Sequence, residues 1–375
     1  MLARSPSSRP LLIAAISGRA LAAAARCAGY RPFVADLFCD SDTVALSERA
    51  VRIPGSLQAG IDGRHLVATL TEMAGGEEPE ALVYGSGFES RPELLDELAR
   101  HFPLAGSPAG TVRRVKDPEI LAADCTALGI PHPPFRWDAP PDPENWMIKK
   151  VGGAGGSHVR RARDAAATPG SYFQRFIRGR SISALFIGDG RSARIVGFSR
   201  QWASPIPAAP YRYGGAVRLK RFDTRQAETI GGWLSGLAAR TGLIGLCSAD
   251  FIRAGDGFHL VEVNPRPGAT LDLFDSEQAP LLKAHLNAGK GETAPLPRFA
   301  DSMASMIVYA RRATEQFPAI AWPDWASDRQ MPGTRLLSGD PVCTAFARGP
   351  NAAAARRAVV ELARQLQDNW EGCRT

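Results

Sequence analysis

The sequence predicts a mixed α/β protein, and three observations carry that prediction. The chain opens with a strand, a helix and a second strand, the pattern of a parallel sheet. A strand that ends in two lysines runs into a glycine-rich segment and a returning strand. A late apolar strand ends in FHLVEVNPRPG, residues 258–268. With 375 residues, the chain is long enough for two or three domains.

Composition narrows the class of protein. The net charge is +7, but the arginines are scattered and lack aromatic interleaving, so a nucleic-acid partner is not indicated. Lysine occurs only at positions 116, 149, 150, 220, 283 and 290. The cysteines form neither a CxxC motif nor a cluster with histidine, which fits a reducing cytoplasm without a zinc site. The first apolar run, residues 11–16, is too short for a leader or a membrane span.

The first unit, residues 1–104, is predicted to be a small parallel sheet of Rossmann-like kind. Its expected elements, in order, are a strand at 11–16, a turn at 17–19, a helix at 20–29, strands at 31–38 and 81–88, and a helix at 91–102. The Gly-Ser-Gly at 85–87 lacks the full GxGxxG spacing. The sequence therefore does not support a nucleotide site in this unit.

Three further regions follow at 105–180, 181–299 and 300–375. The expected elements are a helix at 117–128, a glycine-rich hairpin after residue 146, strands at 171–190 and 192–202, a helix at 226–240, a hairpin turning at 255–257, short strands at 305–313, 332–340 and 341–349, and a helix at 352–369. The last region is predicted to be a β-rich tail with a terminal helix.

The late hairpin carries three oxygen-bearing side chains. Glu262 and Asn264 stand two residues apart on one strand and therefore share a face. If Ile252 pairs with Phe258 across a five-residue loop, Asp250 lies opposite Leu260 and diagonal to Glu262, also on that face. Carboxylate and amide oxygens are donors that Mg²⁺ accepts. A slip of one residue would turn Asp250 to the other face, so the prediction depends on the register.

The glycine-rich hairpin predicts a phosphate-binding loop. Glycines at 152, 153, 155 and 156 let backbone amides approach phosphate oxygens, and Ser157 adds a donor. Lys149 opens this loop, and Lys116 is a second candidate for a phosphate-facing ammonium. The extended segment 174–177 can present its backbone to an adenine edge while Phe176 and Ile177 cover the ring, although alone these two would be ordinary core residues.

The order of these parts resembles the ATP-grasp superfamily of ligases over about residues 10–300. EVNPRPG, with IKKVGGAGG upstream, is the specific core of the resemblance. It implies an ATP-grasp fold that uses ATP and two Mg²⁺ ions, with Mn²⁺ as a substitute. The roles it implies are ATP phosphate binding by Lys116 and Lys149, flap closure by Gly152, Gly153, Gly155, Gly156 and Ser157, adenine binding by Gln174, Arg175, Phe176 and Ile177, and metal binding by Asp250, Glu262 and Asn264.

The resemblance also implies catalytic roles for Arg266 and Lys149, with Arg266 facing the transferred phosphoryl group or a substrate carboxylate. Three departures stand out. Gln174 replaces an acid that is common in the family, Ser181 replaces an acid that often holds the ribose, and Lys150 replaces a proline. The third leaves open which of the two adjacent lysines faces ATP.

Members of this family activate a carboxylate as an acyl phosphate, which an amine attacks to give an amide, ADP and phosphate. Arg19, Glu89, Tyr213 and Gly214 are the candidates for the substrate side. YRYGG and GFSRQW resemble ATP-grasp proteins of methanofuran and methanopterin cofactor biosynthesis, which implies ligation of glutamate or a related amino acid in one-carbon metabolism. The acid and the amine stay unidentified, and a homodimer is expected by resemblance.

Two other functions are compatible with these motifs. One is an ATP-dependent carboxylase that uses bicarbonate, and it would need a separate carrier because no biotin-acceptor MKM occurs. The other is a non-catalytic nucleotide-binding protein that kept the fold. The presence of both lysines and all three oxygen ligands argues against the second.

Overall fold

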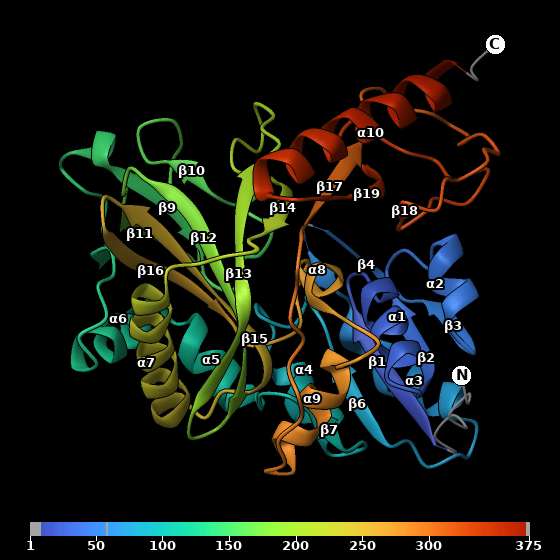
Figure 1. Cartoon of the computed structure of the whole chain (residues 1–375), viewed down its shortest axis with the longest axis horizontal. Helices are drawn as coiled ribbons and strands as arrows, with labels where there is room; N and C mark the ends of the chain where they lie inside the picture. The colour runs from blue at the N-terminus through green and yellow to red at the C-terminus, as the bar shows by residue number, and fades with distance from the viewer. Residues whose placement is uncertain (1–8, 58, 373–375) are drawn as a thin grey trace.

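The computed structural model describes residues 9–57 and 59–372 and begins with a five-stranded parallel sheet (Figure 1). The sheet order is β3 (Arg49–Arg52), β2 (Arg31–Asp36), β1 (Pro10–Ala15), β6 (Ala81–Tyr84) and β7 (Leu104–Ala105). β1 is buried along its whole length, as expected for a parallel strand covered on both faces. The chain order reverses between β1 and β6, and such a switch point opens a crevice at the carboxyl ends of the strands.

Short elements surround this sheet. They are α1 (Arg19–Cys27), α2 (Ser41–Leu46), β4 (Gly55–Ser56), β5 (Gly60–Ile61), η1 (Gly63–His65), α3 (Leu66–Ala74) and α4 (Glu93–Ala99). The strand expected at 81–88 ends at Tyr84, and the following residues form the turn that leads to α4.

The second part is a four-stranded antiparallel sheet behind two helices. α5 (Ala109–Lys116) and α6 (Pro118–Ala127) are separated at Asp117, whose carboxylate accepts hydrogen bonds from the N–H groups of Glu119 and Ile120. This N-cap places Lys116 at the end of α5. The sheet order is β10 (Arg160–Arg161), β9 (Trp146–Lys150), β11 (Ser171–Arg175) and β8 (Phe135–Arg136), with η2 (Pro143–Asn145) before β9.

The third part is an eight-stranded sheet that includes the C-terminal region. Its order is β16 (Gly257–Asn264), β15 (Ile244–Ala254), β12 (Arg180–Asp189), β13 (Ala193–Ala203), β14 (Tyr213–Arg218), β17 (Ser302–Tyr309), β19 (Pro341–Gly349) and β18 (Ala326–Ser327). The helices of this part are α7 (Thr224–Thr241), α8 (Leu271–Phe274), α9 (Leu281–Gly289) and α10 (Ala352–Gly372). The ladder between β14 and β17 carries the sheet across residues 299 and 300.

One expected strand is wrong. Residues 332–340 contain turns and a single bridge, between Thr314 and Leu336, because local hydrogen bonds satisfy this backbone instead of a ladder. The N–H of Thr334 donates to the carbonyl of Met331, and that of Leu337 donates to the carboxylate of Asp340.

The late hairpin has a different turn from the one expected. Ala254 pairs with Gly257, so the turn is the two residues Gly255 and Asp256 rather than a five-residue loop. Gly255 has a φ of 58°, a conformation typical of glycine in tight hairpin turns. Ile252 consequently pairs with His259, not with Phe258.

A β-bulge corrects the effect of that shorter turn. Phe251 pairs with Leu260, and the next pair is Asp250 with Glu262, so Val261 is an extra residue on β16. Without this residue, Glu262 would pair with Ala249 and point away from Asp250. The bulge therefore brings both carboxylates to one face, and Asp250 lies directly opposite Glu262 rather than diagonal to it.

Two further features bear on the sequence predictions. No helix within residues 9–57 and 59–372 combines the length and apolar character needed to cross a membrane. Cysteines 27, 39, 125, 247 and 343 carry free thiols, and Cys373 lies outside the described residues.

A buried histidine predicts a pH-dependent stability. His285 of α9 accepts a hydrogen bond at Nδ1 from the N–H of Leu246, at 2.8 Å, and burial lowers its pKa to about 4. The unfolded chain binds a proton near pH 6.5, so stability should fall by up to about 3 kcal/mol as the pH drops from about 6.5 to about 4. His285→Asn keeps an acceptor near Nδ1, and urea unfolding should show a weaker loss of stability in this range. His65→Asn, at an exposed position, should leave the loss unchanged.

Candidate active site

A cleft lies between the four-stranded sheet and strand β16, with about 570 Å³ of space, part of it open to solvent. Its charged lining consists of Glu262 and three of the six lysines in the chain, Lys116, Lys149 and Lys150. The other lining residues are Val115, Pro118, Leu121, Ala122, Cys125, His132, Pro133, Phe135, Gly152, Gly153, His158, Tyr172, Gln174, Leu260 and Val261. This excess of ammonium groups favours an anionic ligand.

The predicted metal ligands lie together at one edge of this cleft. Asp250 and Glu262 are direct cross-strand partners, and the amide of Asn264 donates to the Asp250 carboxylate at 3.2 Å. Lys116 Nζ donates to Glu262 Oε1 at 2.6 Å and to Asn264 Oδ1 at 2.8 Å. The carboxylates, the amide and an ammonium group thus form one connected polar cluster.

The electrostatics of the two carboxylates differ. Burial, followed by the neighbouring Glu262, raises the pKa of Asp250. Burial also acts to raise the pKa of Glu262, but the ammonium groups of Lys116 and Lys149 outweigh it, and the pKa is lowered. Glu262 is therefore the carboxylate that the surrounding charges keep ionised.

The donor set fits a hard cation only with additional ligands. Two carboxylates and one amide oxygen are donors that Mg²⁺ accepts. Within residues 9–57 and 59–372, however, no group of three or more His, Cys, Asp or Glu side chains is placed to hold a metal. Because Mg²⁺ is commonly bound by one or two carboxylates together with substrate phosphates, the set fits a cation that arrives with a polyphosphate.

The two adjacent lysines of β9 differ in direction. Lys149 is partly buried, and its Nζ donates to the carbonyl of Val261 at 3.4 Å, whereas Lys150 is exposed. Val261 is the extra residue of the bulge, so its carbonyl is free to accept this bond. Burial lowers the pKa of Lys149. Lys149 thus crosses the cleft toward the carboxylates, while Lys150 lies at the rim.

The glycine-rich segment, residues 152–157, connects β9 to β10 and is docked against the rest of the molecule. The carbonyl of Gly155 accepts a hydrogen bond from the N–H of Tyr213, at 2.9 Å. A Cβ atom on Gly156 would lie 2.1 Å from the carbonyl oxygen of Tyr211, and one on Gly152 would lie 2.5 Å from that of Glu89. These contacts describe a flap in a closed position.

The Gly156 contact gives a testable prediction. Gly155 and Gly156 both have a φ near 70°, but a Cβ on Gly155 would meet nothing within 4 Å. Alanine should therefore strain the backbone similarly at both positions, by about 1 kcal/mol, and clash only at position 156. We expect Gly156→Ala to raise amide hydrogen exchange in residues 151–160 and at Tyr213 well above the level in Gly155→Ala. Equal exchange in both variants would contradict the docking contact.

Comparison with known proteins identifies the domain that holds this cleft. Residues 126–270 match the family model of the ATP-grasp domain. The chain carries an ATP-grasp domain. The match spans the flap, β11 to β15 and the late hairpin with its carboxylates, and it includes most of the cleft residues.

Solved structures extend the likeness over most of the chain. One is the biotin carboxylase domain dimer of Hydrogenobacter thermophilus 2-oxoglutarate carboxylase with MgADP, ADP and bicarbonate, at 13% identity and a TM-score of 0.69, covering 93% of this chain and 89% of that chain. Another is an ADP complex of N5-carboxyaminoimidazole ribonucleotide synthetase, at 14% and 0.67, covering 98% and 99%. The synthetase from Thermus thermophilus gives 15% and 0.66, covering 94% and 98%. The predicted ATP-grasp fold is confirmed.

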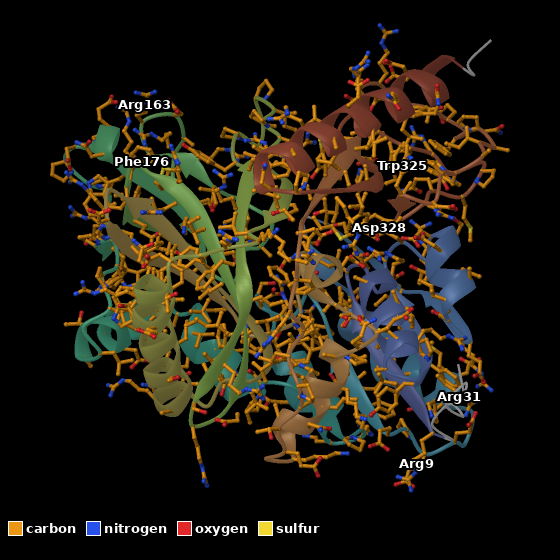
Figure 2. The ribbon with its side chains drawn as sticks, in the orientation of Figure 1. Arg9, Arg31, Arg163, Phe176, Trp325 and Asp328 are labelled. Carbon is orange, nitrogen blue, oxygen red and sulfur yellow. The ribbon has the colours of Figure 1, made fainter. Side chains whose placement is uncertain are left out.

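The segment predicted to hold adenine is only partly at the cleft of the ATP-grasp domain. Gln174 lines the cleft, whereas Arg175, Phe176, Ile177 and Ser181 are not among its lining residues. Phe176 is 37% exposed, and the guanidinium of Arg161 lies 4.0 Å from its ring centroid. Figure 2 shows Phe176 toward the periphery of the molecule.

Arg266 of the NPRPG motif is held by the N-terminal sheet. Its Nε donates to Glu89 Oε1 at 2.7 Å, and both side chains are buried. The N–H of Gly87 donates to Glu89 Oε2 at 2.8 Å, and the hydroxyl of Tyr84 donates to the carbonyl of Pro265 at 3.0 Å. The carboxyl end of β6 therefore fixes both the guanidinium and the backbone of the motif.

The other substrate-side candidates make contacts away from the cleft. Arg19 is buried, with Nη1 2.6 Å from Asp272 Oδ1 and Nε 2.9 Å from Asp328 Oδ1, so it ties α1 to α8 and to the segment after β18, where Figure 2 labels Asp328. Tyr213 accepts a hydrogen bond at its carbonyl from Tyr309. A Cβ on Gly214 would meet the backbone of Ser204 at 2.7 Å.

Three polar residues at the site escaped the sequence predictions. Gln201 of β13 donates to Asp250 Oδ1 at 3.2 Å, and nothing local in the sequence marks it. Tyr172 lines the cleft two residues before Gln174, so the period of two along β11 was an available signal. His158 also lines the cleft, directly after Ser157 at the end of the flap.

Proposed function

We propose that this protein is an ATP-dependent ligase that activates a carboxylate and joins it to an amine. The supporting observation is the arrangement of Lys116 and Lys149 around the Asp250, Glu262 and Asn264 cluster, in the cleft of an ATP-grasp domain. Solved relatives with this fold hold ADP or MgADP. By this proposal the cleft binds ATP.

In the proposed complex, the charges of the cleft meet those of the triphosphate. Lys149 and Lys116 contact its phosphates, with Lys116 leaving Glu262 and Asn264, and the flap covers them. Asp250, Glu262 and Asn264 would hold two Mg²⁺ ions, or Mn²⁺ in their place, and the metal would supply neutralisation of the phosphate charge. Gln174 would meet the adenine amino group through its amide oxygen.

The proposed reaction proceeds in two steps. A substrate carboxylate oxygen attacks the γ-phosphorus of ATP, and the bond to the bridging oxygen breaks with release of ADP. The amine then attacks the acyl carbon of the acyl phosphate, phosphate leaves, and the nitrogen loses a proton. Arg266, fixed by Glu89, faces the phosphoryl group or the carboxylate during these steps. The docked flap keeps water from the acyl phosphate.

For the substrates, we propose a small acid and an amino acid such as glutamate, in the synthesis of a one-carbon carrier, supported by the YRYGG and GFSRQW segments alone. A bicarbonate-dependent carboxylase is the second candidate, favoured by the likeness to a biotin carboxylase domain solved with bicarbonate. The same domain was solved as a dimer, which supports a homodimer here.

ADP release tests the proposal. The purified protein is incubated with MgATP, pooled amino acids and candidate carboxylic acids, and separately with MgATP and bicarbonate. We expect ADP and phosphate with the acid and amine pools together, and a product whose mass equals their sum less one water. Stimulation by bicarbonate alone would favour the carboxylase. Tight ATP binding without ADP release under all conditions would favour a non-catalytic protein.

A further inference from the structure

We propose that His158 contacts the nucleotide, with its Nδ1 donating a hydrogen bond to the β-phosphate of ADP or ATP. This inference deepens the proposed function and rests on it. It assigns a specific polyphosphate contact to a side chain of the flap, where the sequence pointed only to backbone amides and Ser157.

The position of His158 is set by its neighbours. The ring lines the cleft together with Lys149, Lys150 and Glu262. Two residues later, Arg160 pairs with Ile148 in the ladder, and its Nη1 donates to the carbonyl oxygens of Ser157, at 2.7 Å, and Val159, at 2.9 Å. The backbone on both sides of His158 is therefore tied to the end of β10.

Gly153 leaves room for the ring. A Cβ atom at position 153 would lie 2.5 Å from both Cδ2 and Nε2 of His158. This close approach places the imidazole against the backbone of the flap on its Cδ2 and Nε2 side. The ring is thus held within the cleft between the flap backbone and the lysine and glutamate side chains.

Nδ1 of His158 has no partner. The atom is buried, and no polar group of residues 9–57 and 59–372 forms a hydrogen bond with it. Leaving a buried polar atom unpaired is unfavourable, and native structures rarely do so unless a ligand or water completes the bond. The cleft around it carries three lysines against one glutamate, so an anion is the ligand these charges favour.

The experiment compares variants that differ in the placement of one N–H group. His158→Asn puts its amide nitrogen near the position of Nδ1, and His158→Gln puts its amide nitrogen near that of Nε2, while His158→Ala removes both. His132→Ala is the matched control, because His132 lines the same cleft but its Nδ1 already has the carbonyl of Ile130 as a partner at 3.2 Å. Binding of ADP and of AMP, each with Mg²⁺, is measured by isothermal titration calorimetry.

We expect His158→Ala and His158→Gln to weaken ADP binding by about tenfold, as for the loss of one hydrogen bond to a charged group. His158→Asn should stay within about threefold of the wild type, and His132→Ala should change ADP affinity by no more than this. AMP affinity should be unchanged in the His158 variants, because AMP lacks the β-phosphate. Thermal unfolding of the ligand-free variants checks that the fold is retained.

Two results would overturn the contact. Unchanged ADP affinity in His158→Ala would exclude it, and equal losses for AMP and ADP would show a merely structural role. Failure of the wild-type protein to bind ADP at all would overturn the proposed function and the inference together. Wild-type ADP binding with an indifferent His158→Ala would overturn the inference alone.

Discussion

Replacing Glu262 by glutamine is expected to reduce ATP-dependent ADP release by roughly two to three orders of magnitude. Glu262 is the carboxylate that Lys116 and Lys149 keep ionised, and glutamine keeps its size but removes the charge that attracts a divalent cation. The substitution also removes the strongest partner of Lys116, whose Nζ lies 2.6 Å from Glu262 Oε1. The measurement is steady-state ADP release at saturating MgATP, with the acid and amine pools that support turnover.

Asp256→Asn provides the control for this substitution. Asp256 lies in the turn of the same hairpin and loses the same charge, but its side chain is fully exposed. We expect wild-type ADP release from this variant. Turnover by Glu262→Gln within a few-fold of the wild type would remove Glu262 from the metal site and, with it, the role of the hairpin in catalysis.

Replacing Glu89 by glutamine is expected to destabilise the protein by about 3 kcal/mol at pH 7, the scale of breaking a buried ion pair. Both oxygens of Glu89 accept, one from Arg266 and the other from the N–H of Gly87. The amide nitrogen of glutamine must therefore face one of these donors. The free energy of unfolding in urea measures the loss.

The pH dependence of this effect has a defined sign. Burial alone would raise the pKa of Glu89, but the guanidinium of Arg266, with help from Lys116, outweighs it and lowers the pKa to about 2. The stabilisation by ionised Glu89 is therefore complete above about pH 4.5 and lost as the pH falls toward about 2. The stability difference between wild type and Glu89→Gln should shrink over that range.

Glu93→Gln is the matched control, because Glu93 pairs with Arg91 at the surface and its side chain is 61% exposed. Such a pair contributes at most about 1 kcal/mol, so its loss should be small at every pH. A Glu89→Gln protein as stable as the wild type at pH 7 would show that Arg266 does not depend on this carboxylate.

The predictable part of the site is local in sequence. Strand alternation placed Glu262 and Asn264 on one face, and the glycine-rich hairpin was visible because strands and turns have short-range signatures. The register of the late hairpin was not predictable in the same way. It depends on a two-residue turn and on a bulge at Val261, and only the two together put Asp250 opposite Glu262.

The remaining features depend on contacts between distant parts of the chain. Arg266 and Glu89 are 177 residues apart, and the guanidinium of Arg19 is shared between Asp272 and Asp328, 253 and 309 residues away. No local pattern encodes such partners. A lone histidine is also a weak signal, so the place of His158 in the cleft became visible only when the flap was folded against its neighbours.

The continuous eight-stranded sheet determines how this protein can be dissected. Val217 of β14 belongs to the same apolar cluster as Val342 of β19 and Trp370 of α10. A protein ending at residue 299 would lose these partners and leave β14 as an unpaired edge, an invitation to aggregate. The C-terminal strands and helix therefore belong to the cooperative folding unit of the catalytic half, and excising them should yield insoluble material rather than a minimal enzyme.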